Sequence, residues 1–195
     1  MTGDEKAARR KAILAARRAV SSAAHAAEAR QLCAHLDIVA RGAGTTCAYV
    51  PTGAEPGSLM LLERLRELCS VVLVPVTRTG PDGEHLPLQW GPYEPGLLVP
   101  ARWGLSEPPE PWLPAEAIAR ADVVLVPALA VDRAGVRLGR GGGFYDRSLR
   151  LCRPGTPLVA VVRDDELVDE LPHQRHDVRM THALTPGSGM VALGE

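Results

Sequence analysis

Three short, uninterrupted apolar runs lie along this chain, at residues 71–76, 123–127 and 158–162. Runs of this length, rich in valine and leucine, are typical of strands that are buried on both faces, as in a parallel sheet. A shorter stretch at residues 46–50 predicts a fourth strand, and residues 86–90 predict a weaker fifth one. The pattern therefore predicts a sheet that lies inside the core of the protein.

Between these runs the spacing of apolar residues changes to that of helices. Residues 4–40 are dense in alanine, arginine and leucine and contain no proline, which predicts one or two helices with a break near Ser21. Leucines three and four positions apart predict a helix over residues 57–69, and shorter helices are expected at 115–120 and 144–152. Helices therefore separate most of the predicted strands.

This alternation predicts the fold class α/β. We expect a single domain over residues 1–195, with helices on both faces of a mostly parallel central sheet in a Rossmann-like three-layer sandwich. Residues 77–114 are rich in proline and glycine and contain three tryptophans, so they are expected to form an ordered loop. In such sheets ligands bind at the carboxyl ends of the strands.

Composition and charge narrow the class of protein. Hydrophobic residues make up 46% of the chain and the formal net charge is −1, so no overall field favours nucleic acid or a membrane surface. The longest apolar run, residues 123–131, contains a proline and is far shorter than the roughly 20 residues that span a bilayer. The N-terminus lacks the apolar segment of a signal peptide, and the four cysteines form no CxxC pair. We therefore expect a cytoplasmic monomer with reduced thiols and with neither nucleic acid nor membrane as a partner.

Residues 137–146, Arg-Leu-Gly-Arg-Gly-Gly-Gly-Phe-Tyr-Asp, carry the strongest chemical signal. A glycine-rich turn that opens onto a helix offers free N–H donors to an anion, and Arg137 and Arg140 add charge-assisted donors for phosphate oxygens. Asp146 can hold a Mg²⁺ that bridges those phosphates. The segment matches neither GxxxxGK[ST] nor a GxGxxG that directly follows a strand. The alternative is a flexible surface loop in which Asp146 is a plain N-terminal charge.

Two further places carry weaker signals. Lys6 and Arg10 lie four positions apart and so share one face of the first predicted helix, where they could cover a polyanionic ligand or simply face solvent. Glu55 follows the end of the 46–50 strand in a turn, where a glutamate is commonly solvated. Neither place identifies a ligand by itself.

Taken together, these segments resemble the 5-formyltetrahydrofolate cyclo-ligase family, also called methenyltetrahydrofolate synthetases. The resemblance extends over nearly the whole chain, and its most specific part is the glycine-loop signature over residues 126–147. Val131 and Phe144 depart from it, since the family commonly has an aromatic residue and a tyrosine there. The weaker elements follow the family's order: Lys6-x-x-x-Arg10, the Tyr49-Val50-Pro51 turn through Glu55, Gly104-Leu105-Ser106-Glu107-Pro108, and Pro172 through Asp177.

The resemblance implies an ATP- and Mg²⁺-dependent cyclisation of 5-formyltetrahydrofolate to 5,10-methenyltetrahydrofolate, with release of ADP and phosphate. Such chemistry needs positioning and charge neutralisation more than a protein nucleophile. The alternatives are a folate- or nucleotide-binding paralogue that has lost turnover, and an unrelated phosphate-binding α/β protein. Retention of Lys6, Arg10, Glu55, Arg137 and Asp146 favours the enzyme over the paralogue, and the match of several segments argues against an unrelated protein.

The resemblance also implies roles for individual residues. The catalytic residues would be Arg140 and Tyr145, and the Mg²⁺ ligands would be Asp146 and, with weaker support, Asp177. The ATP-binding residues would be Lys6, Arg10, Arg137, Leu138, Gly139, Arg140, Gly141, Gly142, Gly143, Phe144 and Tyr145. The folate-binding residues would be Val50, Glu55, Arg140, Gly141, Gly142, Gly143 and Phe144.

Overall fold

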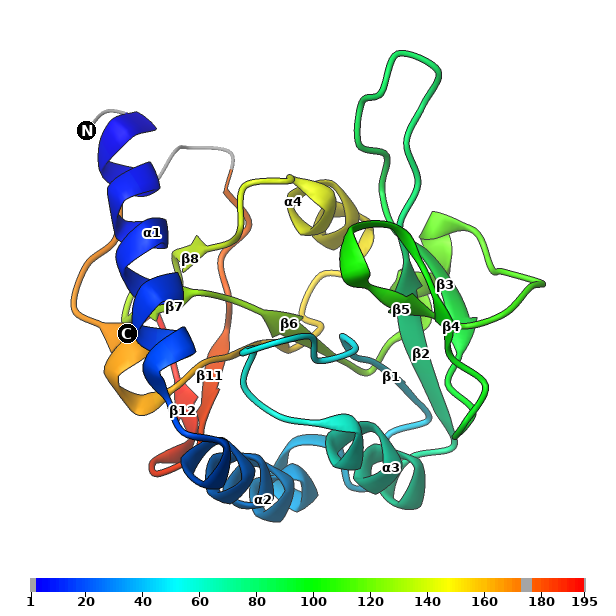
Figure 1. Cartoon of the computed structure of the whole chain (residues 1–195). Coiled ribbons are helices and arrows are strands. Elements are labelled where there is room, and N and C mark those ends of the chain that lie inside the picture. Colours follow the sequence, from blue (N-terminus) through cyan, green and yellow to red (C-terminus); the bar gives the residue numbers. More distant parts are fainter. Residues whose placement is uncertain (1–2, 173–176, 195) are drawn as a thin grey trace.

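A computed structural model describes residues 3–172 and 177–194 of the chain (Figure 1). Its centre is a seven-stranded sheet with the order β12-β11-β9-β6-β1-β2-β3. The five inner strands are parallel, and the two edge strands run antiparallel to their neighbours. The inner strands are β2 (Val71–Val76), β1 (Thr45–Cys47), β6 (Val123–Pro127), β9 (Leu158–Val161) and β11 (His182–Thr185), and the edge strands are β3 (Gln89–Pro92) and β12 (Gly189–Ala192).

Helices cover both faces of this sheet and make three layers (Figure 1). Alternate residues of each strand pack into opposite clusters, because side chains along a strand point to opposite faces. In β6, for example, Val123 and Leu125 face one cluster, and Val124 and Val126 face the other. One layer holds α2 (Ser22–Ala40) and α3 (Leu59–Leu68), and the other holds α4 (Phe144–Ser148) and two 3-10 helices, Ala115–Arg120 and Leu149–Leu151. The α/β fold with a mostly parallel central sheet is confirmed.

The first helix, α1 (Gly3–Ala19), lies apart from these layers. It is separated from α2 at Ser21, whose side chain caps α2 by accepting a hydrogen bond from the N–H of Ala24, so the predicted break is confirmed. Ile13 and Leu14 pack α1 onto a small apolar cluster beside a second sheet. That sheet consists of β10 (Leu167–Val168), β7 (Ala130–Asp132) and β8 (Arg137–Leu138).

The strand order indicates where on the sheet a ligand is expected to bind. Among the parallel strands β1 lies between β2 and β6, so the chain leaves β1 to one side and later returns to the other. The carboxyl ends of β1 and β6 therefore diverge at a topological switch point, which is where open α/β sheets bind ligands. The glycine loop, residues 139–143, directly follows strand β8.

Residues 77–114 form an ordered region, as expected, and the strand predicted at residues 86–90 overlaps β3. A projecting hairpin is joined by a bridge between Thr79 and His85 (Figure 1). Beyond β3, the strands β4 (Val99–Pro100) and β5 (Ser106–Glu107) form a two-stranded sheet and flank a 3-10 turn at Arg102–Gly104. Outside this region, another 3-10 turn follows β9 at Asp164–Glu166. No helix of the described ranges is long and apolar enough to cross a bilayer.

Candidate functional site

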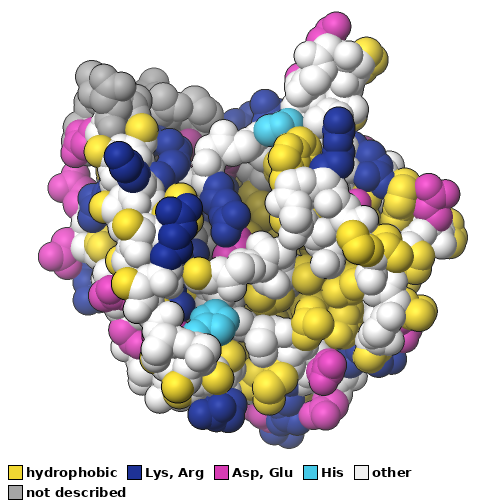
Figure 2. Space-filling model, in the orientation of Figure 1, with side chains coloured by type: hydrophobic (Ala, Val, Ile, Leu, Met, Phe, Trp, Pro, Cys, Tyr) yellow, Lys and Arg dark blue, Asp and Glu magenta, His cyan; other side chains and the backbone are white. Residues whose placement is uncertain are grey.

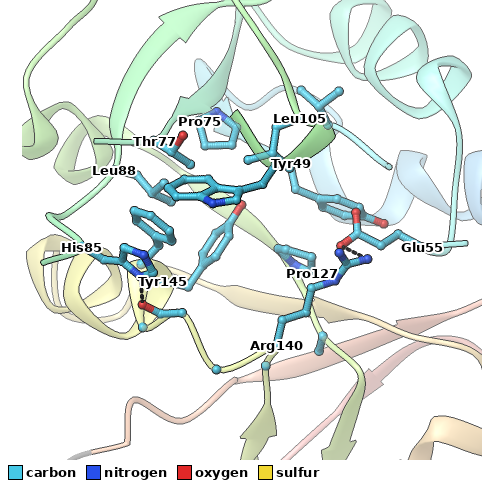
Figure 3. Close-up of a pocket in the computed structure, with 18 of the residues that line it drawn as sticks. Tyr49, Glu55, Pro75, Thr77, His85, Leu88, Leu105, Pro127, Arg140 and Tyr145 are labelled. Atoms are coloured by element: carbon cyan, nitrogen blue, oxygen red, sulfur yellow. Dashed lines mark hydrogen bonds and ion pairs between the residues drawn. The ribbon is translucent and has the colours of Figure 1, made fainter. Parts of the chain in front are cut away.

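A cavity of about 460 Å³ opens at the switch point between β1 and β6. This volume lies within the range of pockets for small-molecule ligands, roughly 300–1,000 Å³. In Figure 2 the hollow lies between Lys and Arg side chains on the α1 side and apolar side chains on the side of the hairpin. Three strand ends and the glycine loop supply most of the lining: Tyr49, Val50 and Glu55 after β1, Pro75 and Thr77 at β2, Pro127, Ala128 and Leu129 at β6, and residues 139–146 (Figure 3).

The glycine loop presents its backbone to this cavity. Gly141 and Gly143 have φ values of 99° and 72°, which favour glycine because a Cβ is strained there. At Gly143 a Cβ would also lie 2.4 Å from Nη1 of Arg147. Within the described part of the chain, the N–H groups of residues 140–143 have no hydrogen-bond acceptor. Four free donors in succession make this loop suited to an anion.

The two arginines of the loop have different surroundings. Arg137 is almost fully buried; its Nη2 lies 2.6 Å from Oδ1 of Asp146, and its Nη1 donates to the carbonyl of Pro127. Arg140 is half exposed and, among the described residues, makes one ion pair, with 3.2 Å between its Nη2 and Oε1 of Glu55 (Figure 3). Arg137 is therefore held in place by the protein, whereas Arg140 is free to meet a ligand.

Glu55 places a carboxylate at one end of the pocket. Its Oε2 accepts hydrogen bonds from the N–H and the hydroxyl of Thr52, both at 3.0 Å, and the residue is buried. These bonds orient the group, while Oε1 faces Arg140. A ligand that supplies N–H donors can replace the guanidinium there.

Tyr145 contributes a buried hydroxyl to the site. Its oxygen is buried and has no hydrogen bond among the described residues, although the side chain lines the pocket. Burial raises the pKa of this phenol above its ordinary value of 10, and the charge of Glu55 adds to the rise. Tyr145 therefore stays protonated at neutral pH and can donate a hydrogen bond but not act as a base. Because buried polar atoms rarely lack partners, this hydroxyl points to a ligand.

Helix α1 lies against the outside of the glycine loop. Nε of Arg10 donates to the carbonyl of Gly139 at 2.9 Å, and Nζ of Lys6 lies 3.7 Å from Oδ2 of Asp177. The described lining of the cavity includes neither basic residue. It also omits Leu138 of β8, whose side chain packs in the small apolar cluster against α1. The resemblance-based ATP residues therefore form two groups, a loop at the pocket and a helix behind it.

The carboxylates offer limited metal-binding groups. Across residues 3–172 and 177–194, no cluster of three or more His, Cys, Asp or Glu side chains could hold a metal ion. Asp146 is half exposed at the rim, with only Oδ1 engaged by Arg137. This donor set fits Mg²⁺, which commonly takes one or two carboxylates and completes its shell with phosphate oxygens and water. Residues 173–176, in the element that runs from Pro172 to Asp177, lie outside the described residues.

Several lining residues were not predicted as site residues from the sequence. His85 stacks on Phe144 with ring centroids 4.2 Å apart, and Trp103 lies edge-on to His85 at 5.6 Å. Arg17 reaches the pocket from α1, and Glu107 accepts from the N–H and hydroxyl of Thr77. The sequence signals for these residues were weak: the basic N-terminal helix for Arg17, the tryptophans of the 77–114 loop, and the 104–108 element for Glu107.

Comparisons of the sequence with known proteins identify one family, and a comparison of structures agrees on the fold. The model of the 5-formyltetrahydrofolate cyclo-ligase family matches residues 2–186. The 5-formyltetrahydrofolate cyclo-ligase of Mycolicibacterium smegmatis is 55% identical over 193 residues, which cover 99% of this chain and 100% of that protein. The Escherichia coli protein of the same name is 32% identical over 145 residues, 74% of this chain and 79% of its own length. The fold is similar to that of 5,10-methenyltetrahydrofolate synthetase from Aquifex aeolicus, with a TM-score of 0.77, 22% identity, and 97% and 93% of the two chains covered.

Proposed function

This chain belongs to the 5-formyltetrahydrofolate cyclo-ligase family of ligases, and from that we propose that it cyclises 5-formyltetrahydrofolate to 5,10-methenyltetrahydrofolate at the expense of ATP. The observation that carries the proposal is the arrangement of one pocket. Free N–H donors of the glycine loop lie on one side of the cavity and the oriented carboxylate of Glu55 lies on the other, with Arg140 between them. Such a pocket suits one ligand rich in phosphate and a second one rich in N–H donors.

In the proposed reaction the formyl oxygen attacks the γ-phosphorus of ATP and ADP leaves. N10 of the same folate then attacks the activated formyl carbon and closes the ring. N10 releases its proton, and phosphate departs with the former formyl oxygen. Both steps join atoms that the substrates already carry, so no protein nucleophile is needed. The protein's contribution is to align the reactants, exclude water and stabilise the charge on the transferred phosphoryl group.

We propose the following roles for residues that border the pocket, and their surroundings support these roles. Glu55 accepts hydrogen bonds from the amino group and ring N–H of the pterin, and Val50 packs against the pterin ring. Arg140, released from Glu55, stabilises the charge on the transferring phosphoryl group. Tyr145, protonated because its pKa is raised, donates a hydrogen bond to oxygen at the reacting centre.

The loop and α1 share the nucleotide in this proposal. The N–H groups of residues 140–143 bind phosphate oxygens, and Arg137 stiffens the base of the loop. Lys6 and Arg10 face the same polyanion from behind the loop and add positive charge. Asp146 and Asp177 would hold Mg²⁺, whose chemistry there is to neutralise charge on the phosphates. We also propose that the protein acts as a cytoplasmic monomer.

The test is an absorbance assay for the methenyl product. Purified protein with 5-formyltetrahydrofolate, ATP and MgCl₂ should give a rising methenyl absorbance, together with one ADP and one phosphate for each product. Omission of ATP, or removal of Mg²⁺ with EDTA, should abolish the signal. Folate binding without product at high protein concentration would instead support a paralogue that has lost turnover. Light scattering at working concentration checks the monomer.

A further inference from the structure

The projecting hairpin between β2 and β3 brings a histidine to the glycine loop. The two arms of the hairpin pair through Thr79 and His85, and the N–H of Leu86 donates to the carbonyl of Arg78. At its base, the N–H of Leu88 donates to Oγ of Ser148 at 2.8 Å. The hairpin is thus anchored to the protein, and the His85 side chain lines the pocket (Figure 3).

His85 makes two contacts with the loop. Nδ1 lies 2.6 Å from the carbonyl oxygen of Gly142, and the imidazole stacks on Phe144 with 15° between the ring planes. A carbonyl oxygen can only accept, so Nδ1 carries the proton and donates. The approach is close, since a Cβ at Gly142 would lie 3.4 Å from Nδ1.

The hydrogen bond to Gly142 has a consequence for the next residue. In a planar trans peptide the carbonyl of Gly142 and the N–H of Gly143 point in opposite directions, so holding one holds the other. The N–H of Gly143 is one of the free donors of the loop. Without His85 the flanking glycines would allow this peptide to rotate, because glycine has the widest backbone freedom of any residue.

We propose that His85 is a positioning residue that keeps the glycine loop in its anion-binding conformation, through the Gly142 carbonyl and the Phe144 ring. A loop that is already ordered loses less conformational entropy when it binds its ligand, so affinity rises without a direct contact. The inference rests on the proposed function in one respect, namely that the loop takes the phosphates of ATP. It assigns a role in nucleotide binding to a segment outside the signature.

Three substitutions separate the two contacts. His85→Ala removes both, His85→Phe keeps the ring that stacks on Phe144, and His85→Asn keeps a side-chain N–H that can donate to Gly142. The matched control is His35→Asn, because Nε2 of His35 also contacts a backbone carbonyl, that of Pro186 at 2.9 Å, but does not line the pocket. Because His85 is only partly buried, the variants should fold, and their unfolding temperatures verify this.

The measurement is the equilibrium affinity for MgATP and, separately, for 5-formyltetrahydrofolate, each without the other. We expect His85→Ala to weaken MgATP binding roughly tenfold, as loss of one hydrogen bond and of loop order would produce. Folate affinity should change less than twofold, His85→Asn should recover most of the loss, and His35→Asn should bind MgATP like the wild type. In turnover, the KM for ATP should rise more than kcat falls.

Three other outcomes would contradict the positioning role of His85. If the wild type binds MgATP and His85→Ala binds it equally well, the positioning role is wrong and the proposed function stands. If His85→Ala weakens folate and leaves MgATP unchanged, His85 is a wall of the folate pocket and the inference fails. If the wild type binds no MgATP at all, the proposed function fails and the inference fails with it.

Discussion

Two arginine–glutamate pairs contribute Arg17, Arg140 and Glu55 to the lining of the same pocket; both glutamates are buried, but the two arginines have different surroundings. Arg17 and Glu166 are both buried, and Nε and Nη2 of the arginine lie 2.7 Å from the two carboxylate oxygens. Nη2 also donates to the carbonyl of Ala128 at the end of β6, at 2.6 Å. The pair therefore ties α1 to the edge of the sheet where the pocket opens.

The second pair, Arg140 and Glu55, is joined by a single contact of 3.2 Å, and about half of the Arg140 side chain is exposed. An arginine held by three bonds in a buried place cannot move without leaving charges unpaired, which is costly. An arginine held by one contact at the surface loses little when it changes partner. The comparison indicates which arginine maintains the fold and which one is available to substrates.

The largest effect should come from breaking the buried pair. Arg17→Met leaves the Glu166 carboxylate buried without its partner and should lower the free energy of unfolding by about 3–5 kcal/mol. Urea denaturation followed by circular dichroism measures this change. Arg163 depends on the same carboxylate, because its N–H donates to Oε2 of Glu166 at 2.8 Å.

The double variant Arg17→Met with Glu166→Gln is the control. It removes both charges but keeps a side-chain oxygen to accept from the N–H of Arg163, so it should recover at least half of the lost stability. If the double variant is less stable than Arg17→Met alone, the loss does not come from an unpaired charge, and the comparison of the two pairs fails.

The next largest effect should come from Arg140, and it should fall on activity. Arg140→Ala should lower kcat about 100-fold or more, because the side chain would stabilise charge that develops in the transition state. The free energy of unfolding should change by only about 1 kcal/mol or less, since the Arg140 side chain is half exposed and Glu55 keeps its two hydrogen bonds from Thr52. Steady-state kinetics and urea denaturation of the same preparation test both statements. Equal losses of activity and stability would remove the distinction between the two arginines.

Interacting residues are easy to predict from the sequence when they lie close together along the chain and hard to predict when they lie far apart. Arg140 and Asp146 lie within one glycine-rich segment, so their shared chemistry is visible in a short motif. Arg17 is separated from Glu166 by 149 positions, and His85 from Gly142 by 57. Nothing local marks these partners, and Arg17 reads as one more basic residue on a charged helix. Only the topology, which folds α1 and the hairpin back onto the pocket, brings them together.

The same reasoning applies to the strands. Apolar runs identify β2, β6 and β9, because these strands are buried on both faces. The strand β11 was missed because His-Ala-Leu-Thr has no such run, and β12 because it lies at the edge of the sheet. Their pairing depends on neighbours supplied by the rest of the fold, which is the usual limit of local propensity.

A smaller effect should follow from changing the other partner of the surface pair. Glu55→Gln keeps the shape of the side chain and removes its charge, so it should raise the KM for 5-formyltetrahydrofolate roughly 10- to 100-fold, the value of a charge-assisted hydrogen bond. The KM for ATP should stay within about twofold. Kinetics with each substrate varied in turn measure the two constants. A larger rise in the KM for ATP would place Glu55 at the nucleotide instead of the pterin.

The smallest effect should come from an exposed ion pair away from the pocket, which serves as a reference for the two arginine–glutamate pairs. Nη2 of Arg153 lies 3.4 Å from Oδ1 of Asp122, and both side chains are about half exposed. Arg153→Ala should change the free energy of unfolding by no more than about 0.5 kcal/mol. Asp122 keeps its other partners, since Oδ2 accepts from the N–H groups of Gly44 and Thr45. A loss comparable to that of Arg17→Met would show that burial does not separate the pairs.

The pH dependence of this pair completes the calibration. The pKa of Asp122 lies below its usual value of 3.8, chiefly because its carboxylate accepts a hydrogen bond from the N–H of Thr45. Burial opposes this effect, whereas the N–H of Gly44 and the charge of Arg153 lower the pKa further. A carboxyl whose pKa is lower in the folded state stabilises the fold above its unfolded pKa, about 3.9, and loses that contribution as pH falls through the folded value. The difference in unfolding free energy between wild type and Asp122→Asn should therefore be constant near neutral pH and shrink below about pH 4. In Arg153→Ala the loss of stability at acid pH should persist, because the backbone donors at Gly44 and Thr45 remain. If the stability of this variant no longer falls at acid pH, the ion pair with Arg153 causes the lowered pKa instead.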